Sequence, residues 1–376
     1  MAGIYIHIPF CKQACNYCNF HFSTQQKNVP AMVDAIISEM GLRKNYLQEK
    51  IATIYFGGGT PSVLQNSDII KIIEAIKNNF EIDEQVEITL EANPDDIQEE
   101  KLQTWKSAGI NRLSIGVQSF VAEDLLWMNR AHNNTMALQS LQWATKYFSN
   151  ISIDLIYGTP TLSDEQWLQN INQAIALQIP HLSCYALTVE PKTVLHSLIE
   201  KKEVQDVDAD KQARHFEILT KRLHQAGFEH YEISNFAKPN YRSKHNSSYW
   251  QGKHYLGLGP SAHSFNGVSR QWNIANNALY LKSIEQKIIP YEIEILTATQ
   301  QLNEYIMTSL RTIEGINLQK IQIDFGEIAA THLIQQATTA INAKHVCVEN
   351  NFLRLTAAGK FLADGIAADL FGEEKN

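Results

Sequence analysis

Cysteine is scarce in this chain of 376 residues, and its distribution excludes a disulfide framework. Three of the five cysteines lie within the first twenty residues. The other two, Cys184 and Cys347, stand alone in apolar stretches, where a cysteine usually acts as a small buried hydrophobe. Disulfide-rich secreted proteins spread paired cysteines along the chain, so we expect a reducing, cytoplasmic environment.

Long hydrophobic runs and an excess of positive charge are also missing. No apolar run approaches the roughly 18 residues of a membrane span. A signal peptide is not expected, because a cysteine motif begins almost at the N-terminus. The formal net charge of −8 argues against a broad nucleic-acid-binding surface. We therefore expect no integral membrane segment and no nucleic-acid partner, and the length leaves room for one large and one smaller domain.

The clustered cysteines form the most informative motif. Cys11, Cys15 and Cys18 follow a hydrophobic strand in a C-x3-C-x2-C spacing. A cubane iron–sulfur cluster normally takes four thiolates, so three cysteines without a fourth in the loop would leave one iron open for another ligand. The alternative is a structural zinc site completed by His21. Such zinc sites usually draw cysteine pairs from two separated segments, and no second pair is present, which favours the iron–sulfur reading.

Short strand-like runs alternate with amphipathic helical segments over the first two thirds of the chain. The expected strands are 4–8, 53–56, 86–90, 112–117, 151–156 and 182–187. The expected helices are 31–48, 67–79, 98–108, 134–147, 164–176 and 208–226. This alternation predicts a parallel sheet with right-handed crossovers. Six units, two short of the closed eight-stranded barrel, predict an α/β fold with a partial (β/α)6 barrel.

Polar and glycine-rich residues follow the ends of several predicted strands. Residues 57–61 come after the second strand and residues 91–94 after the third. The fourth strand closes with residues 116–119 and the fifth with residues 154–158. Because the carboxyl ends of parallel strands form one rim, we expect these residues to converge on a single site.

The pattern changes from about residue 296. Two helices precede a third near 325–342, and a hairpin over 346–355 turns at Asn350-Asn351, a plausible tight-turn pair. A closing helix is expected over 357–370. This order predicts a winged-helix-like α+β module. The module is not rich in Lys and Arg, so a packing or substrate-covering role is favoured over DNA binding.

With these motifs, the chain resembles the radical SAM proteins of the oxygen-independent coproporphyrinogen III oxidase superfamily, nearly from end to end. Pro9-Phe10 before the first cysteine and Tyr17 before the third match that family in detail. Within it, the chain most resembles the heme chaperone branch (HemW-type). The expected division is a barrel domain over 1–230, an extension over 231–290 and a C-terminal winged-helix-like domain over 291–376.

The resemblance implies cofactors and their ligands. Cys11, Cys15 and Cys18 would ligate a [4Fe-4S] cluster, whose fourth iron S-adenosylmethionine would chelate. The positions that match family contacts to S-adenosylmethionine are Tyr5, Tyr17, Gly58, Gly59, Thr60, Glu91, Gln118, Arg130, Asp154 and Ala186. Taken singly, Glu91 and Asp154 could be helix caps or solvated strand ends, and Arg130 a surface helix residue.

Two departures from the true oxidases favour the chaperone branch. The oxidases carry a fourth cysteine where this chain has Phe20, and an extension precedes their cluster loop. Residues 245–250 also read H-N-x-x-Y-W, the motif of the chaperone branch. His245 is the candidate axial ligand for heme, although a histidine beside aromatics is more often a packing residue. Tyr249 and Trp250 offer flat apolar faces to a macrocycle.

The function expected from the resemblance is a heme chaperone that passes heme to respiratory acceptor proteins, and a homodimer would fit the family. The alternative is an oxygen-independent coproporphyrinogen III oxidase that makes protoporphyrinogen IX by radical chemistry. A third reading, from another class, is a zinc-stabilised scaffold that binds a partner through the winged helix. Whether the chain is an enzyme stays open at this point.

Overall fold

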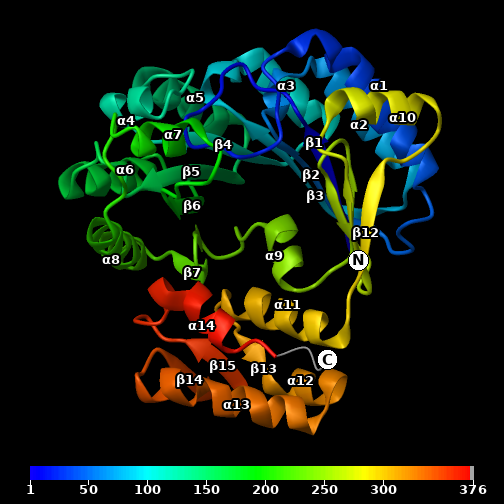
Figure 1. Cartoon of the computed structure of the whole chain (residues 1–376). Helices are drawn as coiled ribbons and strands as arrows, with labels where there is room; N and C mark the ends of the chain where they lie inside the picture. Colours follow the sequence, from blue (N-terminus) through cyan, green and yellow to red (C-terminus); the bar gives the residue numbers. More distant parts are fainter. Residues whose placement is uncertain (373–376) are drawn as a thin grey trace.

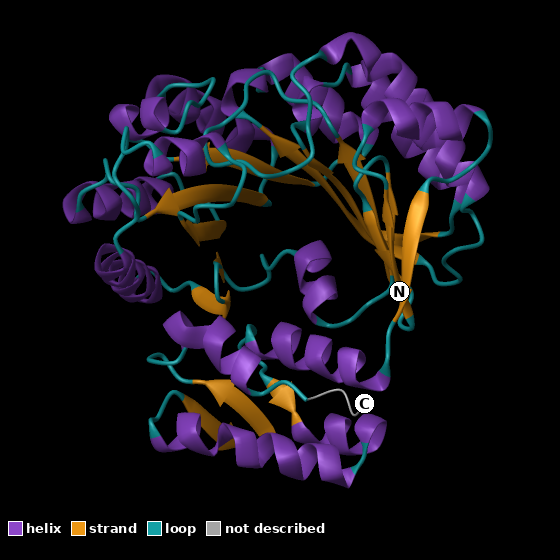
Figure 2. Ribbon diagram, in the orientation of Figure 1, coloured by secondary structure: helices purple, strands orange, loops and turns teal. Residues whose placement is uncertain are grey.

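A computed structural model describes residues 1–372 and shows a curved sheet with helices on its outer face (Figures 1 and 2). Six neighbouring strands pair in parallel in the order of the chain. They are β1 (Ala2–Ile8), β2 (Ile51–Gly58), β3 (Ile82–Ala92), β4 (Arg112–Gln118), β5 (Ile151–Tyr157) and β6 (His181–Ala186). The predicted partial (β/α)6 barrel is confirmed.

Helices connect these strands and follow the last of them; six correspond to the predicted segments, although α1 ends six residues earlier than expected, and the short α4 and α7 were not predicted. They are α1 (Val29–Leu42), α2 (Asn66–Asn79), α3 (Glu99–Ala108), α4 (Ala122–Trp127), α5 (Asn134–Tyr147), α6 (Asp164–Ala176), α7 (Val194–Glu200) and α8 (Ala209–Gln225). Their ends have local causes. Ser163 and Gln166 form a capping box at the start of α6. Gly109, with φ 107°, ends α3 in the left-handed conformation that glycine adopts without strain.

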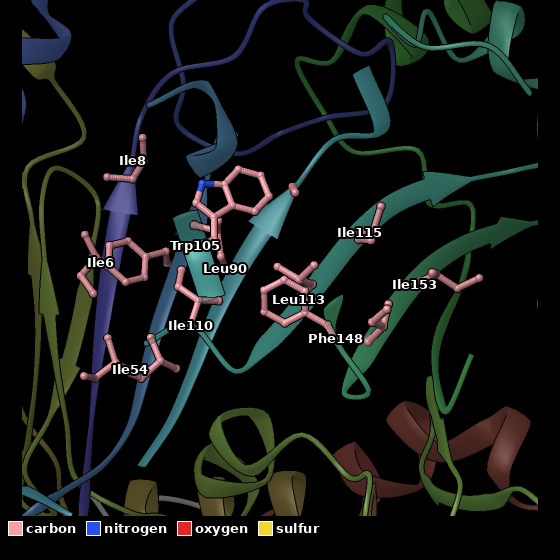
Figure 3. Close-up of a cluster of buried hydrophobic side chains, with 14 of the residues drawn as sticks. Ile6, Ile8, Ile54, Leu90, Trp105, Ile110, Leu113, Ile115, Phe148 and Ile153 are labelled. Atoms are coloured by element: carbon pink, nitrogen blue, oxygen red, sulfur yellow. The ribbon is translucent and has the colours of Figure 1, made fainter. Parts of the chain in front are cut away.

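The main core lies between the sheet and the helices. Ile6, Ile54, Leu90 and Leu113 from four successive strands meet Trp105 of α3 there, and all five side chains are buried (Figure 3). Successive side chains of a strand point to opposite faces, so the residues between these positions face the lumen. The same strands that build an apolar core on one face therefore carry polar side chains on the other.

The sheet continues beyond the barrel strands at both edges. On one side, β9 (Tyr255–Leu258) pairs in parallel with β1, and it is followed by β10 (His263–Phe265), β11 (Ser269–Asn273) and β12 (Tyr291–Ile295). On the other side, β8 (Asn235–Ala237) pairs antiparallel with β6, and β7 (Glu229–Glu232) forms that edge. Helices α9 (Lys244–Trp250) and α10 (Asn277–Glu285) belong to the same stretch of chain. The residues expected as an extension are thus divided between the two edges of one sheet.

A C-terminal module follows with its own hydrophobic core. Its elements are α11 (Ala298–Leu310), β13 (Ile316–Asn317), α12 (Leu318–Phe325), α13 (Glu327–Asn342), β14 (Val346–Glu349), β15 (Phe352–Leu355) and α14 (Ala363–Asp369). The strands form a separate three-stranded sheet in the order β13-β15-β14. This order of helices and strands is that of a winged helix, and the hairpin of β14 and β15 is its wing. Asn350 and Asn351, at φ 50° and 65°, make the predicted tight turn of the wing.

The closing helix is shorter than the expected 357–370. A 3-10 turn, Lys360–Leu362, precedes α14. Gly359 lies so close to the backbone of His345 that a Cβ there would come within 1.9 Å of its carbonyl oxygen. The chain is therefore held against the start of the wing before it can begin a helix. The last four residues of the predicted C-terminal domain lie outside the described residues.

The module lies against the end of the barrel that is opposite the carboxyl ends of the strands (Figure 1). The backbone amide of Ile233 donates to the carbonyl of Arg311 at 3.1 Å, and that of Ile313 donates to the carbonyl of Tyr231 at 3.0 Å. The buried carboxylate of Glu232 accepts from Arg311 at 3.1 Å. In residues 1–372 there is no helix long and apolar enough to cross a membrane.

Candidate functional site at the carboxyl ends of the barrel strands

A cavity of about 400 Å³ opens at the carboxyl ends of the barrel strands, under the cysteine loop. Most of the residues that the sequence marked as candidates line it. They are Cys11, Cys15, Tyr17, Cys18, Gly58, Gly59, Thr60, Glu91, Gln118, Arg130, Asp154 and Ala186. Residues that are far apart in the sequence thus meet at one rim, as expected for strand ends of a parallel sheet.

The cysteine loop is held onto the ends of β1 and β2 by backbone hydrogen bonds. The amide of Gly59 donates to Ile8 O at 2.9 Å, and the amide of Thr60 donates to Phe10 O at 2.8 Å. A Cβ on Gly59 would lie 2.7 Å from that same oxygen of Phe10. Glycine is therefore required at this position for the loop to pack on the strand end, a constraint independent of any ligand.

The thiols of the loop receive hydrogen bonds from the rim. Thr60 Oγ1 donates to Cys11 Sγ at 3.4 Å, and Arg130 Nη1 donates to Cys15 Sγ at 3.2 Å. Burial raises the pKa of Cys11 to about 11 and also raises that of Cys18, so both are neutral thiols until a metal displaces the proton. Three sulfurs with hydrogen-bond donors beside them fit the ligand set of an iron–sulfur cluster.

His21 does not complete a zinc tetrahedron with these cysteines. Its Nε2 bonds to Asn277 Oδ1 at 2.8 Å, and its ring stacks on His7 at 6.2 Å between centroids. Across residues 1–372, no three His, Cys, Asp or Glu side chains are grouped so that they could hold a single metal ion.

Arg130 lies in the loop after α4, with its side chain directed into the site. Its Nη2 donates to Asn93 Oδ1 at 2.7 Å and to Gly116 O at 2.8 Å, in addition to the bond to Cys15. Its Nε is buried and has no hydrogen-bond partner within the described part of the chain. A guanidinium with one unsatisfied donor at the wall of a cavity fits an anionic group of a ligand, such as a carboxylate.

Two carboxyl groups face the lumen on neighbouring parts of the rim. Burial raises the pKa of Glu91 to about 8, and the nearby Asp154 contributes to the shift. Glu91 accepts a hydrogen bond from Tyr55 OH at 2.7 Å. Burial also raises the pKa of Asp154 to about 6, which Arg112 and Arg130 partly oppose. A polar or cationic ligand in the cavity would restore the stabilisation that these carboxylates lose on burial.

Gln118 occupies a strained backbone position at the end of β4. Its φ of 65° lies in the left-handed region that side-chain-bearing residues rarely adopt. The register of β4 against β5 shifts between Ile115 and Gln118, which turns the glutamine toward the cavity. Such strain persists where the surrounding structure overrides the local preference, and it is frequent at functional sites.

Two predicted residues do not line the cavity. Tyr5 lies one step below the rim, where its OH meets His7 Nδ1 at 3.2 Å and its ring stacks on Tyr55 at 6.2 Å. His245, in α9, lies beside the first half of β1 and β2, since a Cβ on Gly3 would come within 3.3 Å of its ring. Both residues belong to the base of the lumen.

At the base of the lumen, His245 is buried and both of its ring nitrogens have hydrogen-bond partners. Only 1% of its surface is exposed, and burial lowers its pKa to about 3. Its Nδ1 meets Thr53 Oγ1 at 2.8 Å, its Nε2 meets Tyr249 OH at 2.8 Å, and its ring stacks on Tyr55 at 4.9 Å. A heme iron could reach either nitrogen only after one hydrogen bond broke and α9 moved. Heme ligation by His245 therefore stays a prediction that this conformation does not provide for.

The cavity also has lining residues that were not among the predicted contacts. Asn93, Ser114, Tyr185 and Glu190 are among them. Asn93 lies in a strand-end segment that the sequence did mark. Ser114 and Tyr185 follow from the two-residue period of their strands, since Gly116 and Ser183 face the lumen beside them. Glu190 lies in a loop and carries no such signal.

Comparison with known proteins places the chain in a family. Residues 5–174 match the Radical SAM superfamily, and residues 296–362 match the HemN C-terminal domain. The heme chaperone HemW of Bacillus subtilis is 33% identical, over 99% of this chain and 100% of its own. The chain belongs to the HemW family. HemW of Lactococcus lactis is 32% identical over 96% of this chain and 97% of its own.

The chain is also similar to an animal protein, and it shares its fold with an oxidase. The mitochondrial radical S-adenosyl methionine domain-containing protein 1 of Danio rerio is 30% identical, over 97% of this chain and 86% of its own. Coproporphyrinogen III oxidase (HemN) from Escherichia coli superposes with a TM-score of 0.85, over 98% of this chain and 90% of its own, at 21% identity. That likeness shows a common fold. The radical SAM match implies a [4Fe-4S] cluster and S-adenosylmethionine for this HemW-family chain.

Proposed function

We propose that this protein is a heme chaperone that holds a [4Fe-4S] cluster and S-adenosylmethionine at the barrel rim, binds heme, and passes it to respiratory acceptor proteins. Cys11, Cys15 and Cys18 would be the cluster ligands. The observation that carries the proposal is the single cavity of about 400 Å³ that these cysteines share with the strand-end residues. The proposal includes a cytoplasmic location and a homodimer, as in the resemblance to the heme chaperone branch.

The residues of the rim would each hold a different part of S-adenosylmethionine. Gly58, Gly59 and Thr60 would receive the amino group, and Arg130 the carboxylate through its unsatisfied Nε. The ribose and adenine contacts would come from Glu91, Gln118, Asp154 and the backbone of Ala186. Tyr17 would lie beside the adenosyl group, and Tyr5 would support the site from below. When bound, a reduced cluster of this kind supplies one electron to the sulfonium, and the protein's part is to orient and bury the reactants.

Phe20 favours the chaperone over the oxidase. It stands where the oxidases carry a fourth cysteine, and 67% of its surface is exposed at the mouth of the cavity. A large exposed aromatic side chain at a cavity mouth suits contact with an apolar ligand or partner rather than acid–base or redox work. The full-length identity to proteins named heme chaperone points the same way.

The test is a hemin titration, followed by absorbance, of protein reconstituted anaerobically with iron and sulfide. Saturable binding near one heme per chain is expected, together with S-adenosylmethionine binding measured by calorimetry. Absence of heme binding, with turnover of coproporphyrinogen III under reducing conditions, would establish the oxidase instead. One zinc and no iron by metal analysis would establish the scaffold.

A further inference from the structure

A second cavity lies at the other end of the barrel, between the barrel and the C-terminal module. It measures about 360 Å³ and adjoins another of about 580 Å³, with which it shares Ile233 and Lys360. We call the first of these the interdomain cavity. Its walls come from α8, from the edge strand region around His230, from the loop after α11, and from the wing. Neither structural part contains this cavity alone.

The walls of the interdomain cavity combine apolar and aromatic surfaces. Phe216 of α8 contributes a ring that lies 5.8 Å from that of His230 between centroids. Ile313, from the loop after α11, and Leu355, from the wing, also line the cavity. Walls that combine apolar surface with polar and charged groups suit a ligand that has both kinds of surface.

The charged side chains that line the interdomain cavity are mainly cationic: Arg311, Arg354 and Lys360, against the carboxylate of Glu349. Lys360 Nζ donates to the carbonyl oxygen of His230 at 3.3 Å, and it forms no ion pair within residues 1–372. Glu232 is near enough to influence Lys360, but its carboxylate already accepts from Arg311 and from Asn235. Burial lowers the pKa of Lys360 to about 8, as expected for an ammonium that lacks a close counter-charge.

A second cation faces the same space from the wing. Arg354 lines the cavity, and its Nε donates to the carbonyl of Glu314 at 3.0 Å. Its Nη1 lies 3.6 Å from a carboxylate oxygen of Glu349, which also lines the cavity; this contact is long and partly exposed. Two cationic side chains therefore approach this cavity from different elements, which matches a ligand that carries carboxylates on an apolar body.

We propose that heme binds in the interdomain cavity, with Lys360 and Arg354 receiving its propionates and Phe216, Ile313 and Leu355 contacting the macrocycle. This inference rests on the proposed heme binding and assigns it a place. It differs from the expectation for His245, whose two nitrogens are occupied in the base of the lumen. The wing and the barrel would both touch the ligand, so a movement of the module would open the site for transfer.

The experiment compares two charge reversals in the same module. Lys360→Glu replaces the unpaired ammonium, while Lys344→Glu makes the same change at an exposed lysine outside the cavity. In full-length, cluster-loaded protein we expect Lys360→Glu to raise the Kd for hemin at least tenfold and Lys344→Glu to leave it within twofold. Hemin dimethyl ester, whose propionates are neutral, should bind wild type and Lys360→Met equally.

The outcomes separate the two proposals. If wild type fails to bind hemin, the heme chaperone function itself falls. If wild type binds hemin and Lys360→Glu binds it as tightly as Lys344→Glu does, the interdomain site is overturned and the function stands. Retained S-adenosylmethionine binding at the distant rim shows that each variant is folded. If Lys360→Glu does not fold, the hemin affinities of Lys360→Met and Arg354→Gln replace it as the test. Unchanged hemin affinity in both of these variants would overturn the interdomain site.

Discussion

The two cavities of this protein are built in different ways. The cysteine cavity collects residues from the carboxyl ends of six parallel strands, so the order of the strands suffices to bring them together. The interdomain cavity collects residues from a barrel helix, an edge of the sheet and the wing, and it exists only because two separate cores dock. The barrel fold by itself is enough to assemble the cysteine cavity, whereas the interdomain cavity depends on how the barrel and the C-terminal module pack together.

The two cavities also differ in the chemistry of their lining. The base of the barrel lumen, where α9 lies, separates them. Thiols and buried carboxyls face the first cavity, and the charged side chains that line the second are mainly cationic. Between them, α9 places His245 against Tyr55 on its lumen side and the ring of Trp250 5.7 Å from the guanidinium of Arg311. Helix α9 therefore contacts the base of the barrel as well as the C-terminal module.

The largest effect is expected from removing a cysteine of the first cavity. Cys15→Ala should abolish nearly all iron binding, because a cluster held by three thiolates cannot keep its position with two. Iron content after anaerobic reconstitution measures this. The matched control is Cys347→Ala, at the wall of the interdomain cavity, which should keep its iron. Equal iron loss in both variants would contradict the assignment.

The next effect concerns Arg130, which bonds to a thiol and two carbonyl-type oxygens at the rim. Arg130→Met should weaken S-adenosylmethionine binding at least tenfold, since losing a charge-assisted hydrogen bond costs about 1.5–3 kcal/mol and each 1.4 kcal/mol is about tenfold. Calorimetry on cluster-loaded protein measures the change.

Arg130→Lys keeps the charge but not the planar fork, and it should restore only part of the affinity. Hemin affinity should not change in either variant, because the interdomain cavity lies at the other end of the barrel. An unchanged S-adenosylmethionine affinity in Arg130→Met would remove this residue from the site.

A moderate effect is expected from His245→Ala. The variant loses two hydrogen bonds and a buried ring, so its free energy of unfolding should fall by about 2–4 kcal/mol. Denaturant unfolding measures it, and Tyr249→Phe, which removes one of the two partners, should lose about 1 kcal/mol. Hemin affinity should stay within twofold of wild type. Complete loss of hemin binding in a folded His245→Ala protein would move the heme site to α9.

The last effect is a pH dependence of stability from Glu91. Its folded pKa of about 8 lies above the ordinary 4.5, so the folded state keeps a proton that the unfolded state releases. The contribution of protonated Glu91 to the free energy of unfolding is fully present below about pH 4.5 and is lost as the pH rises toward 8. In protein free of iron and S-adenosylmethionine, Glu91→Gln should therefore lose less stability than wild type between pH 5 and pH 8. Urea unfolding at a series of pH values measures the free energy of unfolding of both proteins. If it changes equally with pH in Glu91→Gln and in wild type, the raised pKa is contradicted.

The sequence was sufficient for the barrel and for most of its rim. Side chains alternate every two residues along a strand and recur every 3.6 residues around a helix, so the sequence pattern located the six strands and the six longer helices of the barrel. The short helices α4 and α7 span two turns or fewer, too few for a clear period, and were missed. The turn at Asn350-Asn351 was likewise readable, because only a few residues adopt positive φ readily. Strand ends marked by Gly58, Glu91 and Asp154 converge for a topological reason that needs no knowledge of side-chain contacts.

Tertiary structure alone decided which of these residues are buried, paired or free. The pattern around Arg130 fitted a surface helix as well as a site, and its placement depends on a loop packing against Cys15. His245 resembled an available ligand until Thr53 and Tyr249 took both of its nitrogens. Lys360 carried no signal at all. Burial and pairing arise from contacts between segments far apart in the chain, and such contacts leave no local period in the sequence.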